Sequence, residues 1–131
     1  MNFNEVRACL EGDGWPVEVL SDATMRSLFR GGGKVFPLFV HIEQLFITFA
    51  VIPFTKLPND IDAGGTLMKR LLELNREINL AKFSIDDDGD VVLSVEFRLA
   101  DLDPSEVRDA VDVLSFYAEK HYVEVAKLAQ E

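Results

Sequence analysis

The chain has 131 residues, of which 48% are hydrophobic, and its 13 Lys and Arg against 23 Asp and Glu give a net charge of −10. This composition predicts a single domain over residues 1–131 with its own core, and it excludes intrinsic disorder. The single cysteine excludes an internal disulfide framework, and the strong acidity argues against nucleic acids and anionic membranes as partners.

No apolar run approaches the ~20 residues that a helix needs to span a bilayer. Glu5 and Arg7 interrupt the first ten residues, which therefore lack the apolar centre of a signal peptide. We expect a cytoplasmic protein without a membrane partner.

The charge is concentrated in the C-terminal third of the chain. Residues 1–83 carry 9 basic and 10 acidic side chains, whereas residues 84–131 carry 4 and 13. Such a surplus either keeps the surface soluble or forms an acidic face that attracts a basic partner segment. The sequence leaves both interpretations open.

Short elements are expected in the first quarter of the chain. Apolar residues recur at helical spacing over residues 3–11, and the run 12–14 ends this helix. Alternating side chains predict strands over 15–20 and 25–30. The three glycines that follow indicate a hairpin turn rather than a phosphate-binding loop, because a strand and not a helix comes next.

The strands expected over 35–42 and 45–54 are apolar on both faces, so both faces need cover. The dipeptide at 43–44 predicts a tight hairpin between them, and Pro53 is expected to end the second strand or to place it near a sheet edge. In the first strand one side carries Phe36, Leu38, Val40 and Ile42, and the other carries Val35 and Phe39. In the second strand one side carries Leu45, Ile47, Phe49 and Val51, and the other carries Phe46, Ala50 and Ile52.

A longer helix is expected from an N-cap at Asp62 to about Leu80. Asn75 inside this helix either hydrogen-bonds a neighbouring loop or lies exposed on the surface. The apolar stripe consists of Leu67, Leu71, Leu74 and Ile78, and Met68 and Leu72 widen it beyond a single contact seam.

The strands expected over 81–85 and 91–99 form a second hairpin. The turn Asp86–Asp90 fails the calcium-loop pattern, because its glycine is fourth rather than sixth and Phe97 replaces the bidentate glutamate. Clean alternation in the second of these strands, with Ser94 among the outward residues, predicts one solvated face.

The last helix is expected over 103–128. Asp103 is its N-cap, Pro104 occupies the first helical position, and Glu106 completes a capping box. We therefore predict an α+β fold of order α-β-β-β-α-β-β-α, with a mainly antiparallel five-stranded sheet packed with helices.

Few residues have the pattern of a catalytic or metal-binding site. His41 and His121 are far apart in sequence, and we interpret both as packing residues. Cys9 has no neighbour in sequence that would lower its pKa, so a role as a small hydrophobic residue is expected. We expect no catalytic residue, no metal and no cofactor.

Three motifs follow one another in the second half of the chain: Leu-x-x-x-Asn at 71–75, Phe-Ser-x-Asp at 83–86 and a glycine-containing hairpin at 89–93. With the order of elements over 3–128, they resemble the YbjN-like family of bacterial proteins, which are labelled sensory transduction regulators and are related in fold to type III secretion chaperones. The resemblance implies a small, acidic, cytoplasmic homodimer that binds a protein segment and has no cofactor or catalytic residue.

The leading hypothesis is a non-enzymatic protein–protein interaction module, a chaperone-like or regulatory homodimer that binds a segment of a partner protein. It rests on the two strands with two apolar faces and on the widened helix stripe. The residues expected at the partner or dimer surface are Phe46, Ile52, Met68 and Leu72.

Two alternatives remain. A small-molecule-binding sensor would enclose a pocket between the sheet and the last helix. A hydrolase would need either histidine beside a nucleophile or a carboxylate in a cleft. The residues expected to line the sensor pocket are Trp15, Phe39, Phe49 and His41.

Overall fold

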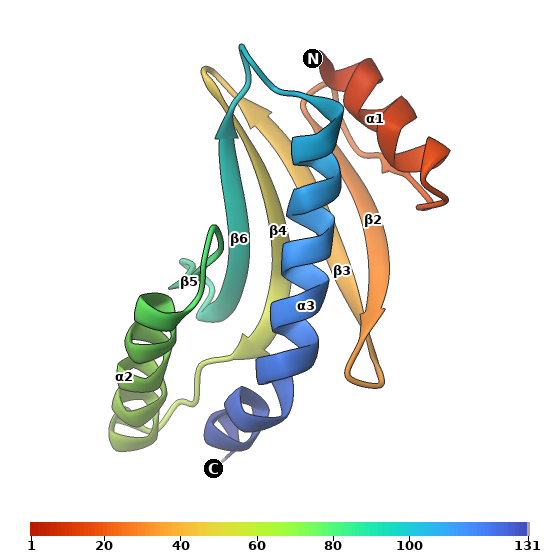
Figure 1. Ribbon diagram of the computed structural model, residues 1–131. Helices are drawn as coiled ribbons and strands as arrows, with labels where there is room; N and C mark the ends of the chain where they lie inside the picture. Colours follow the sequence, from red (N-terminus) through yellow and green to blue (C-terminus); the bar gives the residue numbers. More distant parts are fainter. Residues whose placement is uncertain (131) are drawn as a thin grey trace.

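The computed structural model describes residues 1–130, so Glu131, the last residue of the expected domain, lies outside it. Figure 1 shows a curved antiparallel sheet with α3 lying across one face. Within the described residues the elements are α1 (Phe3–Gly12), β1 (Glu18–Val19), β2 (Thr24–Gly31), β3 (Lys34–Glu43), β4 (Phe46–Lys56), α2 (Ile61–Glu77), β5 (Lys82–Ile85), β6 (Asp90–Arg98) and α3 (Pro104–Ala129).

The α+β class and the antiparallel sheet are confirmed, with strand order β1-β2-β3-β4-β6-β5. Within residues 1–130 the sheet has six strands rather than five. The predicted order of elements leaves out the alternating segment at 15–20, part of which forms the two-residue strand β1. None of the helices within residues 1–130 combines the length and apolar character needed to cross a membrane.

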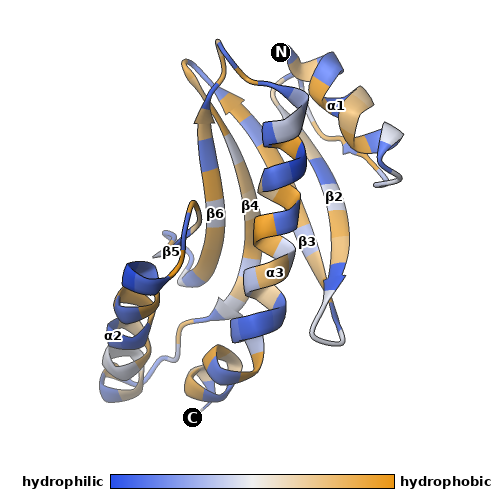
Figure 2. Ribbon diagram, viewed as in Figure 1, coloured by the Kyte–Doolittle hydropathy of each residue, from blue (hydrophilic) through white to orange (hydrophobic). Residues whose placement is uncertain are grey.

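The core lies between α3 and one face of the sheet. Every second side chain of the long strands points to this side, and most of these side chains are buried. Figure 2 shows the apolar residues of strands and helix as orange bands. The enclosed strand residues include Phe29, Phe36, Leu38, Val40, Ile47, Phe49, Val51, Leu93 and Val95.

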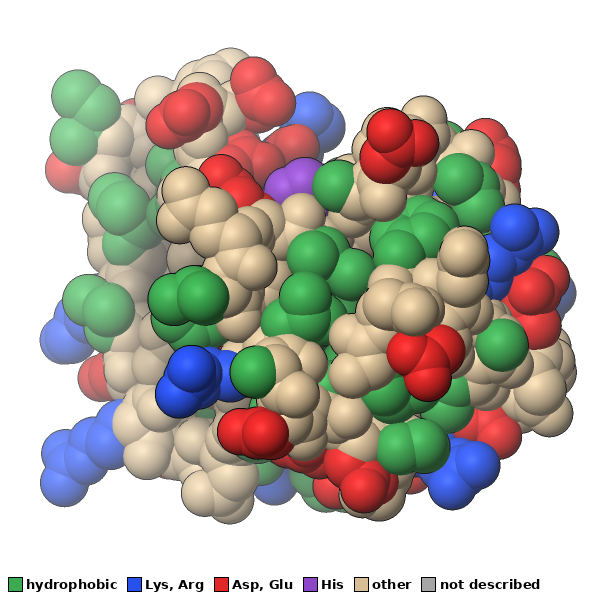
Figure 3. Space-filling model, turned by 90° about the horizontal axis from the view of Figure 1, so that it is seen from above, with side chains coloured by type: hydrophobic (Ala, Val, Ile, Leu, Met, Phe, Trp, Pro, Cys, Tyr) green, Lys and Arg blue, Asp and Glu red, His purple; other side chains and the backbone are tan. Residues whose placement is uncertain are grey.

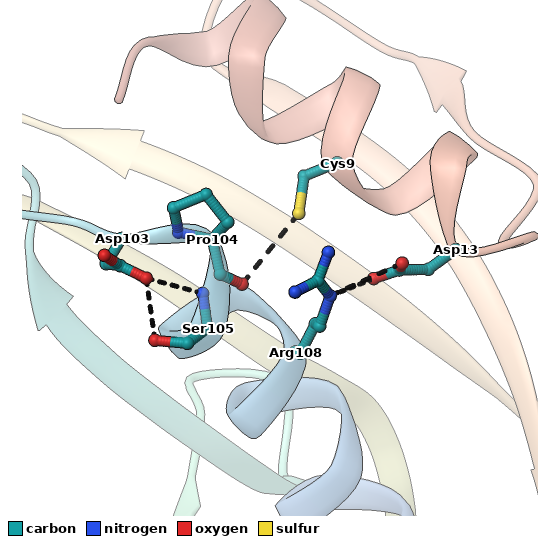
Figure 4. Close-up of polar contacts among 6 residues, drawn as sticks. All are labelled: Cys9, Asp13, Asp103, Pro104, Ser105 and Arg108. Carbon is teal, nitrogen blue, oxygen red and sulfur yellow. Dashed lines mark hydrogen bonds and ion pairs between the residues drawn. The ribbon is translucent and has the colours of Figure 1, made fainter.

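The start of α3 is built as predicted. The carboxylate of Asp103 accepts from the Ser105 amide at 2.8 Å, and Glu106 completes the capping box. Helix α1 docks beside this end (Figure 4): Arg108 Nε lies 3.2 Å from an Asp13 carboxylate oxygen, and the Cys9 thiol points at a backbone carbonyl of α3. Burial raises the pKa of the Cys9 thiol, which keeps it protonated and unreactive.

Helix α2 differs from the prediction at both ends. Its N-cap is Asp60 rather than Asp62, and the Asp60 carboxylate accepts from the Ala63 amide at 2.8 Å. The helix ends at Glu77 instead of near Leu80, because the chain leaves it through a tight turn. The predicted stripe is confirmed as the buried face: Leu67, Leu71, Leu74 and Ile78.

Two expectations about the sheet are wrong. Pro53 does not end β4, which continues through a register shift between Val51 and Thr55 that takes the proline out of the ladder. The outward side of β6 is not solvated along its whole length, since Val92 and Ser94 are buried. Ser94 lies between Ala50 on one neighbouring strand and a β5 residue on the other, which shields it.

Candidate partner-binding surfaces

The sheet face turned away from α3, here called the outer face, carries exposed apolar side chains. Phe46 is 48% exposed, Leu28 46% and Val35 44%, while Phe39 and Ile52 are half-buried. The prediction that the middle strands are apolar on both sides is therefore confirmed. Their inner side is enclosed within the chain, and their outer side is only partly covered by the described residues.

Basic side chains border the outer face along β2. The Arg26 guanidinium lies 5.9 Å from the centre of the Phe39 ring, and Arg30 is exposed on the same side of the strand. Toward the opposite border of the sheet, Lys82 and Glu96 form an ion pair at 2.6 Å, so their charges cancel. The β2 border thus carries two arginines although the protein as a whole is acidic, and Glu18 of β1 lies opposite Arg26.

The β5 edge of the sheet is closed by a side chain of α2. The Asn75 amide nitrogen donates to the Phe83 carbonyl at 3.0 Å, and its oxygen accepts from the Phe83 amide at 2.6 Å. Asn75 therefore takes the place of a neighbouring strand at this edge. Of the two interpretations of this asparagine, the hydrogen-bonding one is confirmed.

The opposite edge is open along most of β2. Strand β1 pairs only with Met25 and Arg26, so no described strand lies beside residues 27–31. The Ile42 amide donates to the Ala23 carbonyl at 2.9 Å, which sets the alternation of hydrogen bonds between β2 and β3. By that alternation the backbone groups of residues 28 and 30 point away from β3, toward the open edge.

Helix α2 carries an exposed apolar stripe, here called the α2 stripe. It consists of Ile61, Met68 and Leu72, which are 88%, 42% and 71% exposed, together with Gly65. Met68 and Leu72 also line a hollow of about 190 Å³ against β5. The structure thus brings these two predicted residues together.

Phe46 and Ile52 both lie on the outer face, at separate positions along β4, and do not share the hollow of the α2 stripe. Sequence reasoning missed Ile61 and Gly65 as members of the α2 stripe. The signal that could have found them is their spacing of seven residues from Met68 and Leu72, which places all four along one side of a helix.

The two histidines differ in environment. His121 is buried with its ring 6.0 Å from the Tyr117 ring, and burial lowers the pKa of its imidazole. His41 is exposed on the outer face, where its Nδ1 lies 2.7 Å from the Thr24 hydroxyl and its Nε2 lies 3.8 Å from a Glu43 carboxylate oxygen. The hydrolase hypothesis requires a cleft, but the side chains of His41 and Glu43 are 46% and 76% exposed.

The pocket of the sensor hypothesis does not form as expected. Phe49 is fully buried on the core side of the sheet, whereas Phe39 and His41 point to the outer face. Since these residues lie on opposite sides of one sheet, they cannot line a common cavity. That assignment is wrong.

The acidic turn Asp86–Asp90 is a hairpin, as predicted. Oxygens of Asp86, Asp88 and Asp90 all lie within 4.8 Å of one another. However, Asp86 accepts from the amides of Asp88 and Asp90 at 3.0 and 2.9 Å, and Gly89 takes a φ of +76°. The Asp86 carboxylate thus stabilises the turn, while the Asp90 carboxylate pairs with Lys56 at 3.3 Å.

Residues 7–128 match the family model described as TY-Chap1, T3SS (YopN, CesT) and YbjN peptide-binding chaperone 1. This chain belongs to that family. No curated protein matches it.

Solved structures show the same fold. The ExoU–SpcU heterodimer from the type III secretion system of Pseudomonas aeruginosa contains a chain with 22% identity and a TM-score of 0.63, covering 94% of this chain and 96% of that one. YbjN from E. coli is 14% identical with a TM-score of 0.66, and the match covers 95% of this chain and 93% of that one. A chain of the ExsC–ExsE complex is 17% identical with a TM-score of 0.64, and the match covers 98% of this chain and 97% of that one. The resemblance to a YbjN-like and secretion-chaperone-like fold is therefore confirmed.

Proposed function

We propose that this TY-Chap1 protein is a non-enzymatic, chaperone-like or regulatory module that works as a cytoplasmic homodimer and binds a segment of a partner protein. The family is described as peptide-binding, and two of the similar structures are complexes with a second protein. The observation that carries the proposal is the exposed apolar outer face beside an open β2 edge.

The partner segment adds as a strand along residues 27–31. Main-chain hydrogen bonds to the backbone groups of Leu28 and Arg30 supply affinity, and side chains of the segment pack on the outer face, with Phe39 as one contact. Arg26 and Arg30 favour a segment in which acidic residues alternate with apolar ones. The closed β5 edge does not offer the same backbone groups.

The second copy packs on the α2 stripe. Its exposed residues repeat at the spacing of a helix–helix seam, and a methyl group added at Gly65 would meet no atom within 4 Å, so the space for a second helix is free there. Met68 and Leu72 are central to this interface, and Phe46 and Ile52 belong to the partner surface. We expect light scattering at micromolar protein to give the mass of a dimer, and Leu72→Asp to reduce it to that of a monomer.

A matched pair of variants tests the strand-addition site. Leu28→Ala and Leu28→Pro both remove the leucine side chain, but only proline also removes the amide that points to the open edge. Partners captured from native cells and identified by mass spectrometry should be retained by the Ala variant and lost with the Pro variant. Equal capture by both variants, at matched melting temperatures, would contradict strand addition at this edge.

A further inference from the structure

A hollow of about 540 Å³ lies beside the middle of α3 and shares no lining residue with the outer face or the α2 stripe. One wall is Leu80, in the connection between α2 and β5 that Figure 1 draws in green. The other is formed by Val113, Phe116 and Tyr117 of α3.

Large apolar side chains stand exposed around this hollow. Phe116 is 58% exposed and Leu80 is 53% exposed, whereas Tyr117 beneath them is buried. The Tyr117 hydroxyl accepts a hydrogen bond from the Asn79 amide at 2.8 Å, which fixes the connection against α3. The hollow therefore has a rigid floor and two exposed apolar walls. Exposed apolar side chains also gather as green patches on the face of the molecule that Figure 3 shows.

The connection holds Leu80 in an unfavourable backbone conformation. The Ala81 amide donates to the Asn79 carbonyl at 2.7 Å, and Leu80 between them has a φ of +67°. This is a three-residue turn of the strained kind, which a leucine rarely adopts. Leu80 is more than half exposed in this turn, so much of its apolar surface is left unpacked in the free protein.

The rim of the hollow is acidic. Asp109 and Asp112 line it from α3, and neither carboxylate forms an ion pair within residues 1–130. Lys120 stands beside the apolar wall, with its Nζ 5.8 Å from the centre of the Phe116 ring. Two uncompensated carboxylates beside exposed apolar groups complement a cationic apolar ligand.

We propose that this hollow docks a short amphipathic segment of another protein, with large apolar side chains flanked by Lys or Arg. A second copy of this chain fits less well, because a two-fold interface would bring Asp109 and Asp112 against the same carboxylates of the partner copy. The inference goes beyond the proposed function, since the two arginines of the β2 border favour an acidic segment instead.

The probe is a fluorescein-labelled amphipathic peptide built from Leu and Lys, compared with the same peptide carrying Glu in place of Lys. Fluorescence anisotropy measures affinity, and amide chemical shifts of the full-length protein locate the site. We expect the Lys peptide to bind and the Glu peptide not to bind, with shifts concentrated at Leu80, Val113 and Phe116.

Three changes test the parts of the site. Phe116→Ser should weaken binding of the Lys peptide by about 10-fold or more. Replacing Asp109 and Asp112 together by Asn should weaken it by about 3- to 20-fold at low salt and much less at high salt. Leu80→Gly should weaken binding while leaving the melting temperature equal to or above that of the unmodified protein, because glycine relieves the strained turn. Val123→Ala, at an exposed α3 residue outside the hollow, is the matched control and should have no effect.

Failure of the Lys peptide to bind at millimolar concentration would overturn the inference, as would equal binding by the Phe116→Ser and Val123→Ala variants. Shift changes confined to β2 and the outer face would also overturn it while supporting the proposed function. Dimerisation lost on changing both aspartates would assign the hollow to a second copy and not to a basic segment.

Discussion

Asn75→Ala tests whether one side chain closes the β5 edge. The change removes two hydrogen bonds to the Phe83 backbone, of 3.0 and 2.6 Å, at a residue that is half-buried. Each such bond contributes a net ~0.5–1.5 kcal/mol to folding. The better helix propensity of alanine returns about 0.5 kcal/mol. We therefore expect the free energy of unfolding to fall by about 1–2 kcal/mol.

The measurement is urea denaturation together with thermal melting, in which this loss corresponds to about 4–8 °C for a chain of this size. Hydrogen exchange of the Phe83 amide adds a local readout, because that amide loses its acceptor. Asn75→Asp keeps the acceptor and loses the donor. At neutral pH its free energy of unfolding should therefore lie between those of the alanine variant and the unmodified protein. At acid pH it should approach that of the unmodified protein, because the protonated carboxyl donates again.

The matched control is Asn79→Ala, which deletes the same amide from an exposed side chain that forms no hydrogen bond within residues 1–130. A change of less than about 0.5 kcal/mol is expected there. Equal losses for the two alanine variants, or unaltered exchange at Phe83, would refute the reasoning that Asn75 stands in for a strand.

Three further predictions concern the dimer, the core and acid stability. Gly65→Ala should raise the free energy of unfolding of the dilute protein by about 0.5–1 kcal/mol, because alanine favours the helix more than glycine does. It should also weaken the dimer, because the added methyl group occupies space needed by the second helix. Sedimentation that shows a tighter dimer would exclude a close helix approach. Leu38→Ala, at a fully buried site, should cost about 2–5 kcal/mol by chemical denaturation, and comparable losses for the exposed Leu28→Ala would mean that the core face is misassigned. Burial lowers the pKa of His121, and a hydrogen bond from Arg70 lowers the pKa of Glu124. For a group whose pKa is lower in the folded state, the stability that it contributes is present above its unfolded pKa. That stability is lost as pH falls through the folded pKa. His121→Gln should therefore flatten the loss of stability below about pH 6.5, and an unchanged slope would contradict this.

Local chemistry explains which parts of the fold are predictable. The capping box of Asp103 and Glu106 is specified within four residues, so the start of α3 is predicted correctly. Asp60 and Asp62 are both able to cap a helix, and the choice depends on the preceding loop: Gly64 lies against Pro58, where an added Cβ would meet the carbonyl oxygen at 3.4 Å. The pattern of capping residues does not reveal such a contact between the helix and the preceding loop.

The surface residues show the same division. Helical spacing correctly separates the buried stripe of α2 from Met68 and Leu72, because periodicity reports which side of a helix faces the core. It does not report which elements become neighbours. Sequence reasoning therefore groups these two residues with Phe46 and Ile52, whereas the structure places the pairs on separate surfaces.

The unequal borders of the sheet limit how copies of this chain can assemble. Endless side-by-side growth of sheets requires two free borders on each molecule, one to accept the next copy and one to be accepted. Asn75 occupies the outer strand β5 at Phe83, so of the two outermost strands only β2 presents an unpaired stretch for backbone pairing. When two molecules pair through their β2 strands, neither keeps a free β2 edge, so fibril-like polymerisation by this route stops at a pair.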